Sequence, residues 1–283
     1  MIQTDGDSLT LYFYPSPYGL DWKTPRSLAL TTLRNAASRK GRRIGHVSIE
    51  IEQRDEKILI FRDHVGMTDI DKTLQRKLLL KEKTGFGILF YNFDGSLESA
   101  AKLDPEVRAR AQTGELSWVK FKISRSVSDR IKQYLDEFKA KGGSCWYGLP
   151  NRPRYGEGGG CSAFGASFLD VAGILLPEFK KHWTNEIEVS EKWIGPPVGT
   201  NPVSFYKIIL GPNSKSWTFS DSPSRKIFFW EPDLMHQWVL NTHKKPQALS
   251  GQKAELKRHE KSLGILYDFQ HLDAPSEPIW LSP

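Results

Sequence analysis

The feature that most constrains the fold is a pair of neighbouring segments, residues 45–53 and 57–64, separated by a short polar turn. In the first segment, GHVSIEIEQ, branched apolar residues alternate with polar ones. A period of two marks a β-strand with one apolar face and one polar face. The two segments therefore predict a β-hairpin, with Glu50 and Glu52 solvated on its polar face.

The rest of the chain mixes strand and helix patterns, and its composition is that of an ordinary globular protein. Hydrophobic residues make up 39% of the 283 residues and aromatic ones 12%, too many for a disordered chain. No apolar run approaches the length of about 18 residues that a membrane span needs, so we expect none. Further strands are expected at 9–14, 85–93, 116–123, 203–210 and 226–230, and helices at 26–38, 69–83, 128–140, 233–240 and 252–263, with others starting at 104 and 161. These patterns predict an α+β fold.

Charge and cysteine content limit the partners and cofactors. The formal net charge of +7 favours approach to anionic polymers, but no nucleic-acid-binding motif is present, so nucleic acid is an unlikely partner. Cys145 and Cys161 are too few for a disulfide framework or a structural zinc site, although a single bridge between them stays open. We expect no cofactor and no metal.

The segment YGEGGGCSAFGASFL places three glycines directly before Cys161 and then starts an amphipathic helix. A helix N-terminus lowers the pKa of a thiol, because the free backbone N–H groups and the helix dipole favour negative charge. Glycines also let backbone N–H groups approach a substrate carbonyl, as an oxyanion hole requires. Cys161 is therefore a candidate nucleophile for acyl chemistry, whereas a passive core cysteine is the alternative.

A nucleophilic thiol needs a base, and His46 is the best candidate. It starts a predicted strand directly after Gly45, which leaves room for another group to approach. The order of catalytic residues along a chain does not restrict their geometry. The alternative is an ordinary histidine at the end of a strand.

These motifs resemble those of a known family. The string CSAFGASFL is similar to the nucleophile segment of NlpC-type cysteine peptidases, and CWYGLPNRPRYG is similar to their approach segment. The histidine precedes the cysteine, as in the circularly permuted branch that holds YiiX-like hydrolases and lecithin retinol acyltransferase-like enzymes. The resemblance covers residues 44–176, with Gly160 in place of the acidic residue that often precedes the cysteine.

The resemblance implies a papain-like fold, in which an antiparallel sheet packs against the helix that bears the nucleophile. It implies Cys161 as nucleophile and His46 as general base. Counting along the hairpin leaves His64 or Asp63 as the third residue, and the acyltransferase branch favours His64. Three further residues are expected to bind substrate: Trp146, Tyr147 and Gly160.

The resulting expectation is a cysteine peptidase or amidase that cleaves an amide bond through a thioester, with a peptidoglycan peptide as substrate. A lipid acyltransferase or esterase on the same fold is the first alternative, and a non-catalytic binder of an anionic polymer is the second. We expect residues 1–182 to form the catalytic domain and residues 183–283 a Trp- and Pro-rich extension packed on it. We also expect a monomer. The compartment stays open between the cell envelope and the cytoplasm, with the envelope favoured.

Overall fold

The computed structural model describes residues 5–38, 42–246 and 253–282, and its centre is an eight-stranded sheet in the order β6-β4-β3-β2-β1-β5-β10-β9. Neighbouring strands are antiparallel except β5 and β10, which are parallel. The strands of this sheet are β1 Ser8–Tyr14, β2 His46–Asp55, β3 Ile58–Asp69, β4 Phe93–Glu98, β5 Ser117–Ile123, β6 Trp146–Tyr147, β9 Ala254–His259 and β10 Ser262–Phe269. The α+β class is confirmed, but the expected antiparallel sheet is wrong, because the C-terminal strand β10 enters it beside β5.

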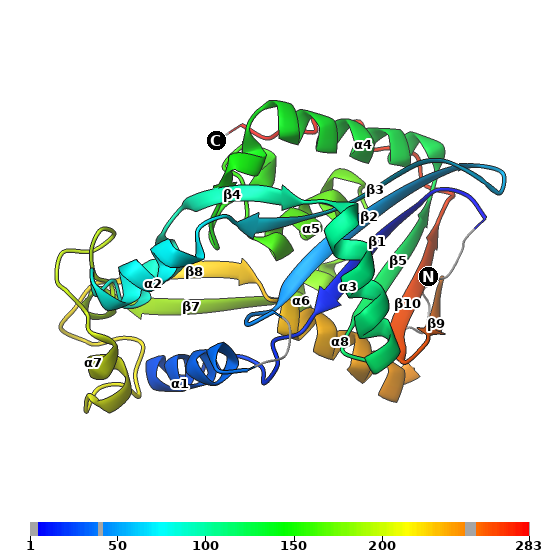
Figure 1. The fold of residues 1–283 in the computed structure, drawn as a ribbon. Coiled ribbons are helices and arrows are strands. Elements are labelled where there is room, and N and C mark those ends of the chain that lie inside the picture. Colours follow the sequence, from blue (N-terminus) through cyan, green and yellow to red (C-terminus); the bar gives the residue numbers. More distant parts are fainter. Residues whose placement is uncertain (1–4, 39–41, 247–252, 283) are drawn as a thin grey trace.

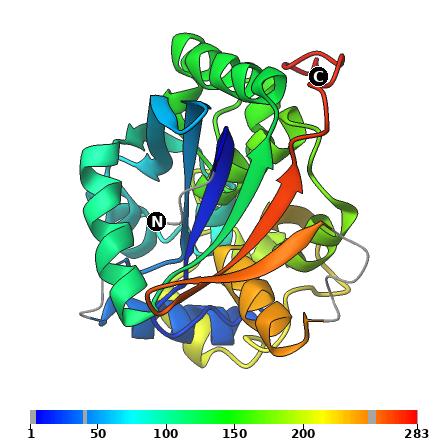
Figure 2. The ribbon, with the colours of Figure 1, turned by 90° about the vertical axis from the view of Figure 1, so that its right-hand side faces the viewer.

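Helices cover both faces of this sheet. Figure 1 shows α3 in front of the strands and α5 behind them, and Figure 2 shows β2, β1, β5, β10 and β9 side by side. The α-helices are α1 Pro25–Ala36, α2 Lys72–Leu80, α3 Ala100–Thr113, α4 Arg125–Ala140, α5 Cys161–Val171, α6 Pro177–Trp183, α7 Phe205–Leu210 and α8 Pro232–Lys244. None of the helices in the described ranges is both long and apolar enough to span a lipid bilayer.

The predicted hairpin is present as β2 and β3, and its two faces differ as the alternation requires. The apolar side chains of β2, such as Val47 and Ile49, are fully buried in a core that includes residues of α4, α5, α6 and α8. The polar face is covered as well. Glu50 and Glu52 are 1% and 8% exposed, so the expectation that they are solvated is wrong.

The polar face stays buried because its charges are paired. Glu50 accepts a 2.6 Å hydrogen bond from the Tyr12 hydroxyl, and Glu52 accepts one of 2.9 Å from the Lys120 ammonium. Buried charges are tolerated when partners of this kind replace water. The sheet therefore has an apolar core on one side and a polar layer under α3 on the other.

Three segments fold differently from the prediction. Residues 85–93 hold a 3-10 helix at Phe86–Phe90 instead of a strand, and residues 203–210 hold α7 instead of a strand. Apolar runs this short fit either structure, so packing decides between them. The predicted helix at 252–263 is instead the hairpin β9–β10, turning at Glu260 with a φ of 54°. Gln252, its predicted first residue, lies outside the described residues.

The C-terminal hundred residues divide between two sheets. Strands β7 Thr184–Ser190 and β8 Ser224–Trp230 form a separate two-stranded sheet. Strands β9 and β10 join the main sheet, and α8 packs against β1, β5 and β10. Residues on both sides of position 182 therefore share one sheet.

Candidate active site

Cys161 is the first residue of α5, and its side chain is only 4% exposed. The preceding loop passes tightly against β6. A Cβ on Gly158, whose φ is +76°, would lie 2.2 Å from the carbonyl oxygen of Trp146. This close approach requires glycine, and it fixes where α5 begins. The first N–H groups of a helix have no acceptor within it, and together with the helix dipole they favour negative charge at this end of α5.

His46, the first residue of β2, is hydrogen-bonded to Cys161, and each group shifts the pKa of the other. Burial raises the pKa of Cys161. The charge of His46, its hydrogen bond and the donors Val47 N–H and Tyr147 hydroxyl outweigh burial, so this pKa lies below its usual value. Burial lowers the pKa of His46 and the charge of Arg42 lowers it further, but the charge of Cys161 and the hydrogen bonds with Cys161 and Glu98 together outweigh both and raise it. The pair is therefore stabilised as thiolate and imidazolium.

Glu98, the last residue of β4, contacts His46, with Oε2 3.0 Å from Nε2. The same carboxylate pairs with Arg42 at 2.9 Å and with Lys102. Burial raises the pKa of Glu98, but the contact with His46 and the charge of Arg42 bring it well below its usual range. An ionised carboxylate in this place orients the imidazole and stabilises its protonated form, as the third member of a catalytic triad does. The candidate site thus brings a thiol, an imidazole and a carboxylate together.

Gly66 makes the contact between His46 and Glu98 possible. Glu98 is on β4 and His46 on β2, and β3 runs between them. Gly66 of β3 is the residue paired with Glu98, and a Cβ there would lie 2.8 Å from Nε2 of His46. The missing side chain leaves the space that the imidazole occupies. Glu98 therefore reaches a strand that is not its neighbour.

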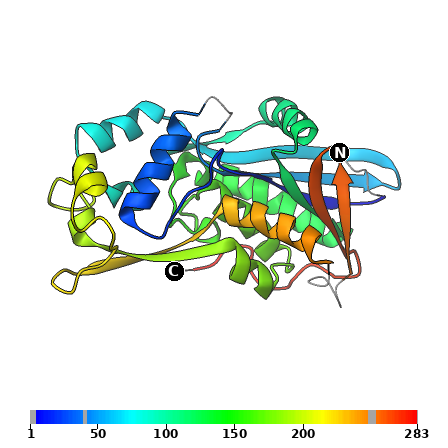
Figure 3. The ribbon, with the colours of Figure 1, turned by 90° about the horizontal axis from the view of Figure 1, so that it is seen from below.

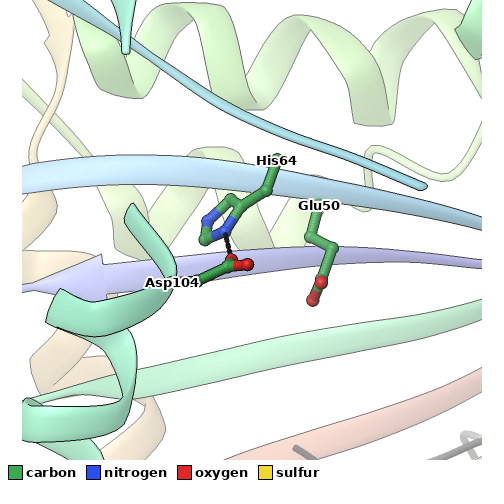
Figure 4. Close-up of side chains that lie close together, drawn as sticks. All are labelled: Glu50, His64 and Asp104. Carbon is green, nitrogen blue, oxygen red and sulfur yellow. Dashed lines mark hydrogen bonds and ion pairs between the residues drawn. The ribbon is translucent and has the colours of Figure 1, made fainter. Parts of the chain in front are cut away.

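The two residues predicted as the third catalytic group have other partners. His64 lies beside Glu50 and Asp104, with Nδ1 2.7 Å from Asp104 Oδ1, and its Nε2 lies 2.9 Å from Ser48 Oγ (Figure 4). Asp63 accepts a 2.9 Å hydrogen bond from Lys139. Both ring nitrogens of His64 are thus engaged away from His46. The carboxylate that lies beside His46 is that of Glu98, whereas His64 and Asp63 contact other groups.

His64 and its neighbours have the spacing of a metal site. Glu50, His64 and Asp104 offer ligand atoms within 4.8 Å of one another. Arg62 already lies among them. It donates to both carboxylate oxygens of Asp104, at 2.8 and 2.7 Å, and to Glu50. This guanidinium supplies the positive charge that a metal would bring, so the cluster is a complete ion-pair network.

An apolar cavity of about 270 Å³ opens beside Cys161. Its volume is near the lower end of small-molecule sites, which run from about 300 to 1,000 Å³. Seventeen of its lining residues are aliphatic or aromatic: Leu20, Trp22, Leu28, Ala29, Ile44, Leu79, Phe86, Ile88, Leu89, Tyr91, Phe93, Tyr147, Leu149, Phe205, Ile208, Phe229 and Trp230. The thiol therefore faces a largely apolar space.

Two of the three predicted substrate-binding residues line this cavity. Gly160 borders it next to Cys161, and the Tyr147 hydroxyl points at the Cys161 sulfur from 3.9 Å. Trp146 is not among the lining residues. Its side chain is 46% exposed, and its carbonyl accepts a 3.1 Å hydrogen bond from the Gly159 N–H. Trp146 thus supports the glycine loop through its backbone.

A second, polar groove lies on the other side of His46. It is lined by His46, Glu98, Arg42 and Lys102 among others, and it is open to solvent. The groove shares Tyr147 and several neighbouring residues with the apolar cavity. Cys161 borders the apolar space and His46 the polar one, so the pair lies where the two meet.

Comparisons with known proteins add no identification. A scan against family models found no match, and searches of curated proteins and of solved structures found none either. Cys145 is exposed and Cys161 is buried, and both are free thiols, so the bridge left open by the sequence is absent.

Glu98 was not predicted, because the third catalytic residue was expected only on the strand next to that of His46. In addition, a strand was predicted at residues 85–93, whereas the strand β4 starts at Phe93. One signal was available: in the segment GSLES, the acidic residue Glu98 stands immediately before Ser99, which precedes α3. A carboxylate at a strand end is a reasonable partner for a histidine at another strand end of the same sheet.

Proposed function

We propose that the protein is a thiol-dependent hydrolase that cleaves an acyl bond through a thioester on Cys161. The contact series Cys161, His46 and Glu98 carries this proposal. A buried thiol with a lowered pKa, beside a histidine that a carboxylate orients, is the arrangement that activates a cysteine nucleophile. A papain-like architecture agrees with the nucleophile at the tip of a helix packed on a sheet.

Each group has a defined step in this chemistry. The Cys161 sulfur attacks the carbonyl carbon, and the backbone N–H groups at the start of α5 stabilise the oxyanion. The His46 imidazolium gives its proton to the leaving group as the bond to the acyl carbon breaks, which leaves the acyl group on sulfur. His46 then takes a proton from water as that water attacks the thioester. Glu98 keeps the ring oriented in both steps.

The two spaces beside the pair favour a substrate with an apolar acyl part and a polar leaving group. The apolar cavity lies on the side of Cys161, where the acyl group would remain after the first step. The polar groove lies on the side of His46, which protonates the leaving group. A lipid ester or amide has this character, whereas a peptidoglycan peptide would place polar groups against apolar walls. The lipid-directed alternative is therefore the better supported one.

The test uses 4-nitrophenyl esters of increasing chain length. We expect wild-type protein to release 4-nitrophenol, and the acyl-enzyme on Cys161 to appear by mass spectrometry after a rapid acid quench. The catalytic efficiency kcat/KM should rise up to about fourfold per added CH₂, since each buried CH₂ contributes about 0.8 kcal/mol. Cys161→Ala should abolish turnover, with Cys145→Ala as the matched control that retains it.

Three results would reject the assignment. Turnover that survives Cys161→Ala would exclude the thiol as nucleophile. Acylation of Cys145 instead of Cys161 would locate the chemistry elsewhere. Cleavage of peptide amides without any preference for longer acyl chains would favour a peptidase over the lipid-directed enzyme.

A further inference from the structure

Three short helices, α1, α2 and α7, gather at one end of the molecule, opposite the tip of the β2–β3 hairpin (Figures 1 and 3). All three contribute lining residues to the apolar cavity beside Cys161, including Leu28 of α1, Leu79 of α2 and Ile208 of α7. Ile44 lines the same cavity and is 46% exposed. The cavity thus reaches the surface close to these helices.

Each of the three helices exposes apolar side chains away from the cavity. In α1 these are Leu30 and Leu33, which are 43% and 46% exposed, and in α2 it is Leu80, at 57%. In α7 they are Tyr206 and Leu210, at 78% and 72%. Single exposed apolar residues are ordinary, but several on neighbouring helices around one opening mark an interaction surface.

Basic side chains accompany these exposed apolar residues. Arg26 and Arg34 share the exposed face of α1 with its leucines, since Arg26, Leu30, Leu33 and Arg34 follow helical spacing. Three more basic residues are exposed on the other two helices: Arg76, Lys77 and Lys207. The sequences of the three helices contain no Asp or Glu, although acidic residues occur in the flanking turns.

We propose that the exposed faces of α1, α2 and α7 form a docking surface for an anionic phospholipid bilayer. Apolar side chains would enter the boundary between headgroups and acyl chains while arginine and lysine remain at the headgroups, as in amphipathic helices that lie in the membrane interface. Basic residues next to an anionic leaflet add electrostatic attraction. The inference rests on the proposed function for its purpose, since a lipid would pass from the bilayer into the adjoining cavity.

The test is co-sedimentation with vesicles of phosphatidylglycerol and phosphatidylcholine in equal amounts, compared with vesicles of phosphatidylcholine alone. Wild-type protein should bind the anionic vesicles and bind them less as salt is added. The double variant Leu80→Glu/Leu210→Glu should lower the partition coefficient at least about tenfold, because two apolar contacts become repelled charges. Lys207→Gln should lower it about fivefold through the loss of one positive charge.

Ile58→Glu is the matched control, because Ile58 is 71% exposed on the hairpin tip at the opposite end. This variant should bind vesicles as the wild type does. Leu80 and Leu210 are exposed and do not line the cavity, so circular dichroism should show an unchanged fold. Hydrolysis of 4-nitrophenyl acetate, which is a soluble substrate, should also stay unchanged in the double variant.

The outcomes separate this inference from the proposed function. Absence of wild-type binding to anionic vesicles, or an equal loss of binding in Ile58→Glu, would overturn the docking surface. Binding that the leucine substitutions leave unchanged while heparin competes for it would overturn it too, in favour of a general polyanion surface. Failure of ester hydrolysis with intact vesicle binding would reject the proposed function alone.

Discussion

Nε2 of His46 lies 3.0 Å from Oε2 of Glu98 although the two residues belong to strands that β3 separates. The contact exists because Gly66, between them, has no side chain. This arrangement brings the carboxylate of Glu98, rather than an acidic residue of the hairpin itself, to the His46 imidazole. Substitutions of Glu98 and of His64 should therefore have different effects.

Glu98→Gln should lower kcat/KM for a soluble ester by about 10²-fold, at the lower end of what general acid–base catalysis contributes. The carboxylate contact raises the pKa of His46, so its loss lowers that pKa. The imidazolium then disappears at lower pH, and the alkaline limb of the pH–rate profile should move to lower pH. The measurement is kcat/KM across pH.

The control for this variant is Glu106→Gln. Glu106 shares Arg42 with Glu98, but its hydrogen bonds go to Arg42 and Arg110. We expect a loss of activity well below that of Glu98→Gln and an alkaline limb close to that of the wild type. Equal profiles for the two variants would argue against a special role for Glu98.

His64→Gln should destabilise the fold and leave the chemistry intact. It breaks the buried contacts of His64 with Asp104 and Ser48, which should lower the free energy of unfolding by about 1–3 kcal/mol. Urea denaturation measures this loss. The kcat of the remaining folded enzyme should match the wild type, and a large drop in kcat without loss of stability would return His64 to the catalytic group.

Tyr147→Phe should raise the pKa of Cys161. The Tyr147 hydroxyl is 3.9 Å from the sulfur and is one of the donors that lower this pKa against the opposing effect of burial. In a Cys145→Ser background, the rate of alkylation by iodoacetamide should follow the thiolate, and its midpoint should shift to higher pH in the Tyr147→Phe variant. An unchanged midpoint would show that the hydroxyl does not stabilise the thiolate.

Glu231 lines the apolar cavity and should make stability depend on pH. Burial raises its pKa to about 7 from the usual 4.5. Between these two values the unfolded chain is ionised while the folded protein holds the proton, so stability falls as pH rises from 4.5 to 7 and then stays low. Compared with Glu231→Gln, wild-type protein should lose up to about 3 kcal/mol over this range, at about 1.4 kcal/mol per pKa unit.

Thermal unfolding at pH 4.5 and pH 8 gives the comparison for Glu231. The Gln variant can still accept a hydrogen bond from the Trp22 Nε1–H through its amide oxygen, but it cannot ionise. A stability difference between the two proteins that does not change with pH would mean that Glu231 ionises as readily in the folded state as in water.

Local patterns sufficed for the parts of the fold that depend on neighbouring residues. The alternation in GHVSIEIEQ predicted β2, and Thr24 followed by Pro25 predicted the start of α1, where the Thr24 side chain accepts from the Ser27 N–H. The helix after the glycine loop begins at Cys161, as expected. In each case the residues that determine the structure are within a few positions of it.

Features that depend on distant contacts could not be predicted. The sequence of residues 203–210 fits a helix and a buried strand equally well. Only packing against α1 decides for the helix α7. The strand pattern predicts that Glu50 is solvated. It is buried because Arg62 and Tyr12, which are distant in the sequence, donate hydrogen bonds to it. The choice of Glu98 required the strand order, which a single sequence does not reveal, together with the gap at Gly66.

The imidazole of His46 lies between the apolar cavity and the polar groove, and this position would set the order of steps in the proposed reaction. Cys161 lines the apolar cavity and His46 the polar groove, so in the proposed reaction the ring would carry protons between the two spaces. The hydrolytic water would then reach the thioester through the polar groove, once the leaving group has left that groove. Leaving group and water would thus use one passage in turn, while the acyl group keeps the other.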